Sequence, residues 1–416
     1  MLNNLTVLVV LFISTSFSAL AQKNLINELN NEIIAIDSNN SQGYTISKES
    51  LGKVLIGNKV IGIGEATHGT KDFIDLRLSL IKNLVENLNY KLIVLECDYS
   101  STLPMNEYIC EGKGSVQTAL KAMGFWMFNN KDFIATVEWL KAYNQNKPEE
   151  NKIKFYGCDM QAPMIIYDLL VGKTVLKNPL TLDEKEGLKL LADYSKTKFS
   201  KNELENLNTL KVQINLRIQE SKESETILNG LHTIVQRVNH KIIGPGKDQS
   251  EFRDKTMAEN FTRIYKQNKA CNTILLAHNL HIRKNHNSSG VSLGSELNKT
   301  YGAFYYALGT SFYRGNVTAA DRDTKQLKTF YVEQNDKKYI EYTFNKLDKD
   351  NFLLDFKSSE QNPDVLSWLQ KSISTRQIGA TFSVSKLDDE NTSRAIVQDE
   401  TFDGLIFLKS TNALNF

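Results

Sequence analysis

Four short runs of apolar residues, separated by longer amphipathic segments, dominate the hydrophobic pattern of this chain. Each run is continuous rather than alternating, as expected for a strand of a parallel sheet that is covered on both faces. The runs are KVIGIGE (59–65), KLIVLEC (91–97), KIKFYGC (152–158) and NTILLAH (272–278).

The segment between the first two runs, residues 71–89, has the spacing of an amphipathic helix. Phe73, Leu80, Leu84 and Leu88 share one face of this helix. A strand, a helix and a second strand in this order predict a right-handed crossover unit. We therefore expect an α/β protein with a mostly parallel sheet.

Two further segments are predicted to be helical. Residues 24–37 (NLINELNNEIIAID) carry a stripe of apolar residues at helical spacing. Residues 180–243 are charged, periodic and almost free of glycine and proline, and residues 244–248 (GPGKD) follow them. We interpret 180–243 as a helical subdomain inserted over the sheet, with GPGKD as the return loop.

The C-terminal part, from Val291 onward, is richer in strands. The clearest strand-like segments there are residues 301–315 (YGAFYYALGTSFYRG) and 403–409 (DGLIFLK).

The N-terminus has the pattern of a secretory signal peptide. Residues 5–17 are apolar, and Ala19-Leu20-Ala21 provides the small-x-small cleavage pattern, although no Lys or Arg precedes the apolar run. We expect residues 1–21 to be removed, so that residues 22–416 act in the periplasm or outside the cell. An uncleaved membrane anchor is the alternative, but the apolar stretch is short for a membrane span. After cleavage we expect no stable association with a membrane.

Composition is that of an ordinary globular protein, with 41% hydrophobic and 24% charged residues. The formal net charge of +2 argues neither for nor against a polyanionic partner. Because the sequence has no dense basic patch with interleaved aromatic residues, we expect no nucleic-acid partner. The four cysteines form no C-x-x-C pair and no zinc pattern. We expect Cys97 and Cys158 in particular to be small buried residues, although export would permit disulfides.

Titratable residues follow each of the four apolar runs, where the predicted strands end. Because the carboxyl ends of parallel strands lie along one edge of a sheet, where ligands bind, these residues predict a site at that edge. They are Glu65 and His68, Glu96 and Asp98, Asp159 followed by Gln161, and His278 followed by His281.

The segment GEATHGTK (64–71) is close to a phosphate-binding loop, but it departs from that pattern. Lys71 and Thr70 are in reversed order, and Glu65 would repel a phosphate group. We interpret the glycines as allowing a tight turn that brings Glu65 and His68 into the crevice. The alternative is that His68 only caps the helix that begins near Thr70.

Arg77 falls on the apolar face of the helix predicted at 71–89. A charged group there must be paired or face a substrate, so we expect it to pair with Glu65 or Glu96. The alternative is an arginine at the edge of the stripe whose guanidinium reaches solvent.

His68, Glu96 and His278 are residue types that can bind a metal ion, so a metal site formed by these three residues is an alternative that the sequence leaves open. His281 and His286 are expected in a solvated loop.

These segments resemble the erythromycin esterase family, which hydrolyses the lactone ring of macrolide antibiotics. The resemblance covers the whole predicted mature chain in the same order. It is carried by GEATHGTKDF (64–73), the arginine of FIDLRLSL (73–80), VLECD (94–98), YGCDMQ (156–161), EFRDKTMAEN (251–260), LLAHNLH (275–281) and FDGLIFL (402–408).

The resemblance implies a three-layer α/β/α core in which helices partly cover an active-site cleft. It also implies hydrolysis by water activated on a histidine, without a covalent serine or cysteine intermediate. We expect no cofactor and no metal ion, although the sequence leaves open whether a metal is needed. His68 would be the base, with Glu65, Glu96, His278 and Arg77 as active-site neighbours. Arg253, with Asp159, would contact the substrate. The sequence leaves open whether Glu65 or Glu96 orients His68.

From the resemblance we expect a monomeric macrolide esterase that confers macrolide resistance, with a small-molecule macrolide as its partner. Two other readings are a hydrolase of another ester or of a cell-envelope substrate, and a non-catalytic periplasmic protein that binds haem or a metal ion.

Overall fold

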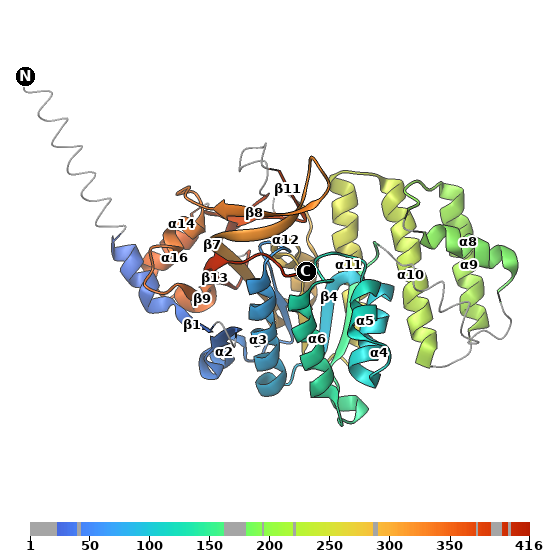
Figure 1. The fold of residues 1–416 in the computed structure, drawn as a ribbon, viewed down its shortest axis with the longest axis horizontal. Coiled ribbons are helices and arrows are strands. Elements are labelled where there is room, and N and C mark those ends of the chain that lie inside the picture. Colours follow the sequence, from blue (N-terminus) through green and yellow to red (C-terminus); the bar gives the residue numbers. More distant parts are fainter. Residues whose placement is uncertain are drawn as a thin grey trace, which may run out of the picture. The chain divides into compact units, whose positions relative to one another are not determined.

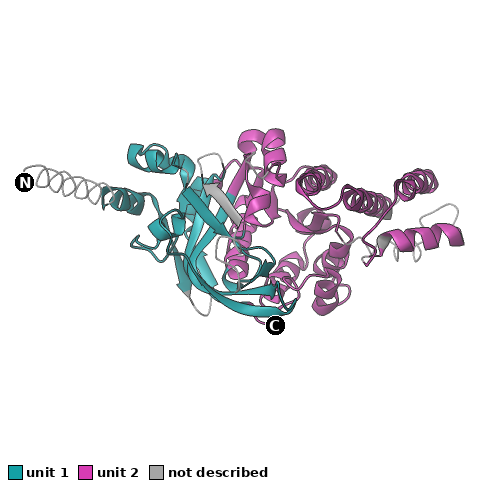
Figure 2. Cartoon of the chain, turned by 90° about the horizontal axis from the view of Figure 1, so that it is seen from above, with its two compact units in different colours: residues 1–54, 65–72, 308–413 teal, residues 55–64, 73–307, 414–416 magenta. Residues whose placement is uncertain are grey.

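A computed structural model of the chain describes residues 23–39, 43–161, 180–193, 195–218, 222–285, 290–371, 373–383, 393–397 and 401–416 (Figure 1). The predicted signal peptide and His286 lie outside these residues. The chain divides into two compact units, coloured separately in Figure 2. Unit 1 comprises residues 1–54, 65–72 and 308–413, and unit 2 comprises residues 55–64, 73–307 and 414–416.

Unit 2 contains a parallel sheet built from the four predicted apolar runs. Its strands, in spatial order, are β3 (Val60–Ile63), β6 (Thr273–Leu276), β4 (Leu92–Asp98) and β5 (Lys154–Asp159). All three pairings are parallel. All residues of β3 and β6 are buried, as the continuous apolar pattern predicted. The prediction of a mostly parallel sheet in a mixed α/β fold is confirmed.

Helices cover both faces of this sheet. The chain moves from β3 to β4 to β5 in one direction across the sheet and returns from β5 to β6 in the other. Since crossovers between parallel strands are right-handed, helix α3 (Lys71–Leu88) and helices α4 to α6 lie on one face, and α11 (Lys247–Gln267) lies on the other. Figure 1 shows α3 and α6 in front of the strands. The resulting order of helices, sheet and helices agrees with the three-layer core that the resemblance implied.

The predicted phase of α3 is correct, because Phe73, Leu80 and Leu84 are fully buried. Apart from α3, α11 and the helices within residues 182–243, the helical elements in the described part of unit 2 are mostly short connections. They are η1 (Ser100–Thr102), α4 (Leu103–Glu111), α5 (Val116–Ala122), α6 (Lys131–Asn144), η2 (Glu149–Asn151), α12 (Asn279–Ile282), α13 (Leu293–Tyr301) and η3 (Gly302–Phe304).

The described residues between 182 and 243 form three helices, α8 (Leu182–Ala192), α9 (Lys201–Arg217) and α10 (Lys222–Ile243). Thr181 and Ser200 begin α8 and α9 with capping boxes, in which each side chain bonds the third helical N–H and a glutamate returns the bond. The three helices enclose apolar residues of their own, including Leu188, Leu207 and Leu231. None of the helices in the described ranges is long and apolar enough to cross a bilayer.

Unit 1 is built around a mixed sheet. Its strands follow the order β2 (Gly43–Ile46), β1 (Ile34–Asn39), β9 (Asn351–Asp355), β13 (Gly404–Thr411) and β7 (Tyr305–Asp321). The β13–β7 pair is parallel, and the other pairs of this series are antiparallel. The strands β8 (Leu327–Glu333) and β11 (Thr381–Phe382) also pair with β7. The β7 and β13 strands include the two segments predicted at 301–315 and 403–409.

Besides a helix at residues 23–32, the described part of unit 1 also contains a strand pair and four short helices. These elements are β10 (Ile373–Gln377), β12 (Ser393–Val397), α2 (Lys48–Leu55), α14 (Ile340–Phe344), α15 (Phe356–Ser359) and α16 (Pro363–Leu369).

The predicted helix at 24–37 is only partly correct. Residues 23–32 are helical, but strand β1 begins at Ile34. The residues of β1 pair with β2 on one side and β9 on the other. Isoleucines 34 and 36 are β-branched and favour a strand once partner strands are present, so long-range pairing overrides the helical spacing.

Candidate active site

Glu65 and His68 form a hydrogen-bonded pair within unit 1. The Glu65 Oε1 atom lies 2.7 Å from the His68 Nδ1 atom, and the two side chains are only 11% and 13% exposed. A carboxylate can only accept, so Nδ1 carries the hydrogen and the ring lone pair lies on Nε2. This is the tautomer that a histidine needs in order to take a proton through Nε2.

The turn that carries this pair is held by backbone contacts to unit 1 strands. The N–H of Ala66 donates to Thr310 Oγ1 at 3.0 Å, and the carbonyl of Ala66 accepts from the N–H of Ile378 at 2.7 Å. The carbonyl of Gly69 accepts from the N–H of Thr318 at 2.8 Å. A Cβ atom on Gly69 would lie 1.8 Å from the carbonyl oxygen of Thr318, so only glycine fits this contact. The glycine therefore serves backbone packing and not a phosphate group.

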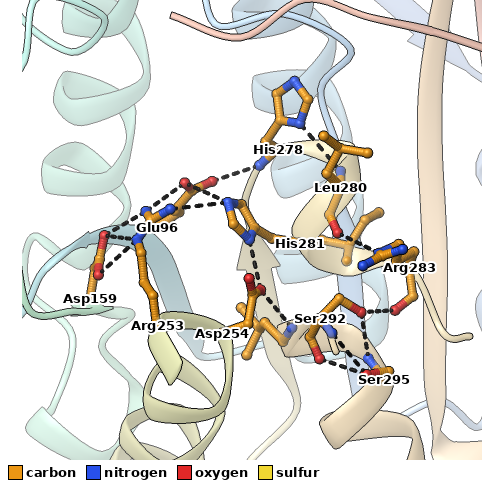
Figure 3. Close-up of polar contacts among 12 residues, drawn as sticks. Glu96, Asp159, Arg253, Asp254, His278, Leu280, His281, Arg283, Ser292 and Ser295 are labelled. Carbon is orange, nitrogen blue, oxygen red and sulfur yellow. Dashed lines mark hydrogen bonds and ion pairs between the residues drawn. The ribbon is translucent and has the colours of Figure 1, made fainter. Parts of the chain in front are cut away.

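A second group of polar side chains, drawn in Figure 3, lies in unit 2 at the carboxyl ends of β4 and β5. Arg253, on α11, forms ion pairs with Asp159 Oδ2 at 2.6 Å and with Glu96 Oε1 at 2.9 Å. Its Nε also donates to Asp159. Burial alone would lower the pKa of Arg253, but the two carboxylates outweigh burial and raise it. The structure thus brings together Glu96, Asp159 and Arg253, three residues that the sequence nominated separately.

His281 belongs to the same group, and the prediction that it lies in a solvated loop is wrong. Its Nδ1 lies 2.7 Å from Asp254 Oδ1 and its Nε2 lies 3.1 Å from Glu96 Oε1. Burial would lower the pKa of His281, but the charges of Asp254 and Glu96, and their hydrogen bonds, raise it to about 10. Asp254 was not nominated from the sequence, although it directly follows Arg253 in EFRD.

His278 has a different orientation, and Figure 3 shows its ring pointing away from the Arg253 group. Its backbone N–H donates to Glu96 Oε2 at 2.8 Å. Its side-chain Nδ1 accepts from the N–H of Leu280 at 3.2 Å and so caps α12. Since Nδ1 is the acceptor, the neutral ring carries its hydrogen on Nε2 and is a donor there.

Arg77 is buried, as its position on the apolar face of the helix predicted. Its Nη2 atom donates to the carbonyl oxygen of Ile63 at 2.9 Å and to that of Ala277 at 2.7 Å. Ile63 is the last residue of β3 and Ala277 directly follows β6, so Arg77 joins the C-terminal ends of two adjacent strands.

The predicted site residues therefore form one group in each unit. Unit 1 holds the Glu65–His68 pair. Unit 2 holds Glu96, Asp159, Arg253 and His278, together with His281, which was expected in a solvated loop, and Asp254, which the sequence did not single out; Arg77 also belongs to unit 2. Among the described residues, no set of three or more His, Cys, Asp or Glu side chains has the arrangement of a metal site. All four cysteines are free, and Cys97 and Cys158 are buried, as predicted.

Comparison with known proteins places this fold and these motifs in a class of esterases and hydrolases. The profile of the erythromycin esterase family matches residues 85–411. This match covers more than half of the chain and includes Glu96, Asp159, Arg253 and His278, whereas Glu65, His68 and Arg77 precede it. The chain belongs to the erythromycin esterase family.

Individual relatives are distant. The chain is similar to erythromycin esterase type II of Escherichia coli, with 24% identity over 317 residues, which are 66% of this chain and 74% of that protein. A succinoglycan biosynthesis protein has a similar structure, with a TM-score of 0.80, 21% identity and coverage of 95% of this chain and 98% of that one. A mutant erythromycin esterase in its open conformation has a TM-score of 0.61 at 17% identity, covering 88% of this chain and 95% of that one.

Proposed function

We propose that this protein hydrolyses the lactone ester of macrolide antibiotics, with water activated by His68. The observation that carries the proposal is the 2.7 Å contact between Glu65 Oε1 and His68 Nδ1 in a member of an esterase family. The similarity to erythromycin esterase type II supports a macrolide as the substrate.

In the proposed reaction, a water molecule attacks the ester carbonyl carbon while His68 Nε2 takes one of its protons. A positioned histidine base contributes about 10² to 10⁴-fold to such a step. Glu65 stabilises the imidazolium that forms, in the way that a buried carboxylate supports a catalytic histidine. The imidazolium then returns the proton to the departing alkoxide. The ester C–O bond breaks, and the products on the opened ring are an alcohol and a carboxylic acid, which releases its proton to solvent at neutral pH.

The carbonyl oxygen gains negative charge during this attack and needs a donor. For this role the proposal assigns His278, whose neutral ring is a donor at Nε2 because Nδ1 already accepts from Leu280. One such donor is typically worth about 3 kcal/mol in the transition state. A His278→Ala variant tests this assignment separately from that of the base.

The experiment is mass spectrometry of erythromycin after incubation with purified residues 22–416, beside a His68→Asn variant, with and without EDTA. The proposal expects a gain in mass of one water molecule that is lost in the variant and unaffected by EDTA. Intact erythromycin with folded wild-type protein would reject the macrolide substrate, and a panel of other esters and cell-envelope polymers would then test the broader hydrolase function.

Two other results would point to different chemistry. Loss of hydrolysis in EDTA would favour a metal-dependent reaction. Visible absorption of a bound haem, or a stoichiometric metal ion without hydrolysis, would favour a non-catalytic protein that binds haem or a metal ion.

A further inference from the structure

Three charged side chains lie within hydrogen-bond distance of the ring nitrogens of His281. Both ring nitrogens face carboxylate oxygens, Nδ1 toward Asp254 at 2.7 Å and Nε2 toward Glu96 at 3.1 Å (Figure 3). Ionised carboxylates only accept hydrogen bonds. Nδ1 must therefore donate to Asp254. Nε2 also lies 3.2 Å from Arg253 Nη1, which only donates, so a neutral ring that accepts from Arg253 is the competing state. The two buried carboxylates favour the state in which Nε2 donates to Glu96 and the ring is an imidazolium cation.

Asp254 is itself held rigidly in this arrangement. Its side chain is 6% exposed, and its Oδ1 also accepts the backbone N–H of Leu293, the first residue of α13, at 2.8 Å. The bond to Leu293 and the bond to His281 thus converge on one oxygen of a buried carboxylate. This leaves the imidazole ring little freedom to rotate.

The charged groups around the ring come from several elements. Glu96 belongs to β4, and Asp159 is the last residue of β5. Arg253 and Asp254 lie on α11. Arg283 follows α12 and interacts electrostatically with Asp254. Arg253 and His281 supply two positive charges to Glu96 Oε1, at 2.9 and 3.1 Å. Glu96 Oε2 then accepts the N–H of His278 at 2.8 Å.

We propose that Asp254 is a positioning residue of the hydrolytic site: it holds His281 as an imidazolium, which together with Arg253 fixes Glu96 and, through it, the turn that carries His278. This inference rests on the proposed function for its catalytic consequence. The ionic state of His281 is independent of that function.

The first test is NMR spectroscopy of the imidazole nitrogens in the full mature chain at pH 8, where an ordinary histidine, with a pKa of about 6.5, is neutral. In the wild type, His281 should have two protonated nitrogens. In Asp254→Asn it should become a neutral tautomer, while Asp248→Asn, an exposed acid on the same helix α11, should leave it unchanged. A neutral His281 in the wild type overturns the proposal, even if the Asp254→Asn chain does not fold.

The second test is kinetic. Asp254→Asn should lower kcat by about 10- to 100-fold with little change in KM, because small displacements of catalytic groups reduce rates by this order. Asp254→Glu, which keeps the charge, should recover part of the loss. A folded Asp254→Asn variant with neutral His281 and a full rate rejects the positioning role. If the wild type hydrolyses no ester at all, the proposed function fails, and the NMR result still decides the state of His281.

Discussion

The Glu65 Oε1 atom and the His68 Nδ1 atom lie 2.7 Å apart, although the two residues are only three positions apart in the sequence. The sequence left open whether Glu65 or Glu96 orients His68, and this contact identifies Glu65 as a partner. Glu96 Oε1 is engaged by Arg253 and His281, and Glu96 Oε2 by the His278 backbone. The two carboxylates therefore have different surroundings, and we assign them different tasks.

Replacing His68 tests the base directly. We expect His68→Asn, which is similar in size, to lower kcat by about 10² to 10⁴-fold, because the lone pair that accepts the proton is lost. Ester hydrolysis measured by liquid chromatography gives the rate, and thermal unfolding confirms that the variant folds. A His68→Asn variant with the wild-type rate would remove His68 from the mechanism.

Replacing Glu65 tests the orienting carboxylate. Glu65→Gln keeps the shape but removes the charge that stabilises the imidazolium, and it permits the other tautomer of His68. Neutralising such a carboxylate in a histidine-dependent hydrolase can cost as much as about 10⁴-fold, so we expect a loss of about 10²-fold or more in kcat. Glu49→Gln, at an exposed position in unit 1, is the control, and its rate should equal that of the wild type. Equal rates for both variants would contradict the proposed role of Glu65.

The strand ends could be predicted because a strand buried on both faces needs a continuous run of apolar residues, and such a run is visible in the local sequence. The apolar runs that end near Glu96, Asp159 and His278 are continuous, and parallel strands must present their carboxyl ends at one edge. The position of each residue relative to a strand therefore follows from the chain alone.

The role of His281 could not be predicted in the same way. Its partner Asp254 lies 27 residues earlier in the chain, on helix α11. No local sequence pattern distinguishes a histidine in such an ion pair from a histidine in a solvated loop. The association of residues 65–72 with residues 308–413 in unit 1 also depends on tertiary contacts, such as that between Ala66 and Thr310. A helical spacing at Ile34 likewise gave way to strand pairing.

The raised pKa of His281 predicts how stability depends on pH. Its pKa is about 10 in the folded protein and about 6.5 in an unfolded chain. Between about pH 6.5 and pH 10 the folded protein therefore keeps a proton on His281 that the unfolded chain has released. This stabilisation is fully present below pH 6.5 and is lost as pH rises toward 10, with a slope of at most about 1.4 kcal/mol per pH unit.

Urea unfolding at several pH values between 6 and 10 measures this slope. We expect a shallower decline in the free energy of unfolding for His281→Gln than for the wild type, because the variant has no imidazole to release a proton. Parallel curves for the two proteins would mean that His281 titrates alike in the folded and unfolded states.

Two glycines of unit 1 predict opposite effects of the same substitution. Gly69→Ala places a Cβ atom 1.8 Å from the carbonyl oxygen of Thr318, a residue of β7. The N–H of Thr318 also donates to the carbonyl oxygen of Gly69. Relieving the clash must separate the turn from the strand, so we expect a loss of stability of about 1–3 kcal/mol or more. Because His68 is the preceding residue, the hydrolytic rate should fall as well.

Gly52 lies in helix α2, and apart from its chain neighbours and the backbone of its own helix no atom lies within 4 Å of the position that a Cβ would occupy. Gly52→Ala should therefore stabilise the protein by about 0.5–1 kcal/mol, since alanine loses less backbone entropy in a helix than glycine does, and the rate should not change. Chemical denaturation of both variants, with ester hydrolysis measured in parallel, checks the pair. If Gly69→Ala were as stable and as active as Gly52→Ala, the close approach of the turn to β7 would have no part in holding His68.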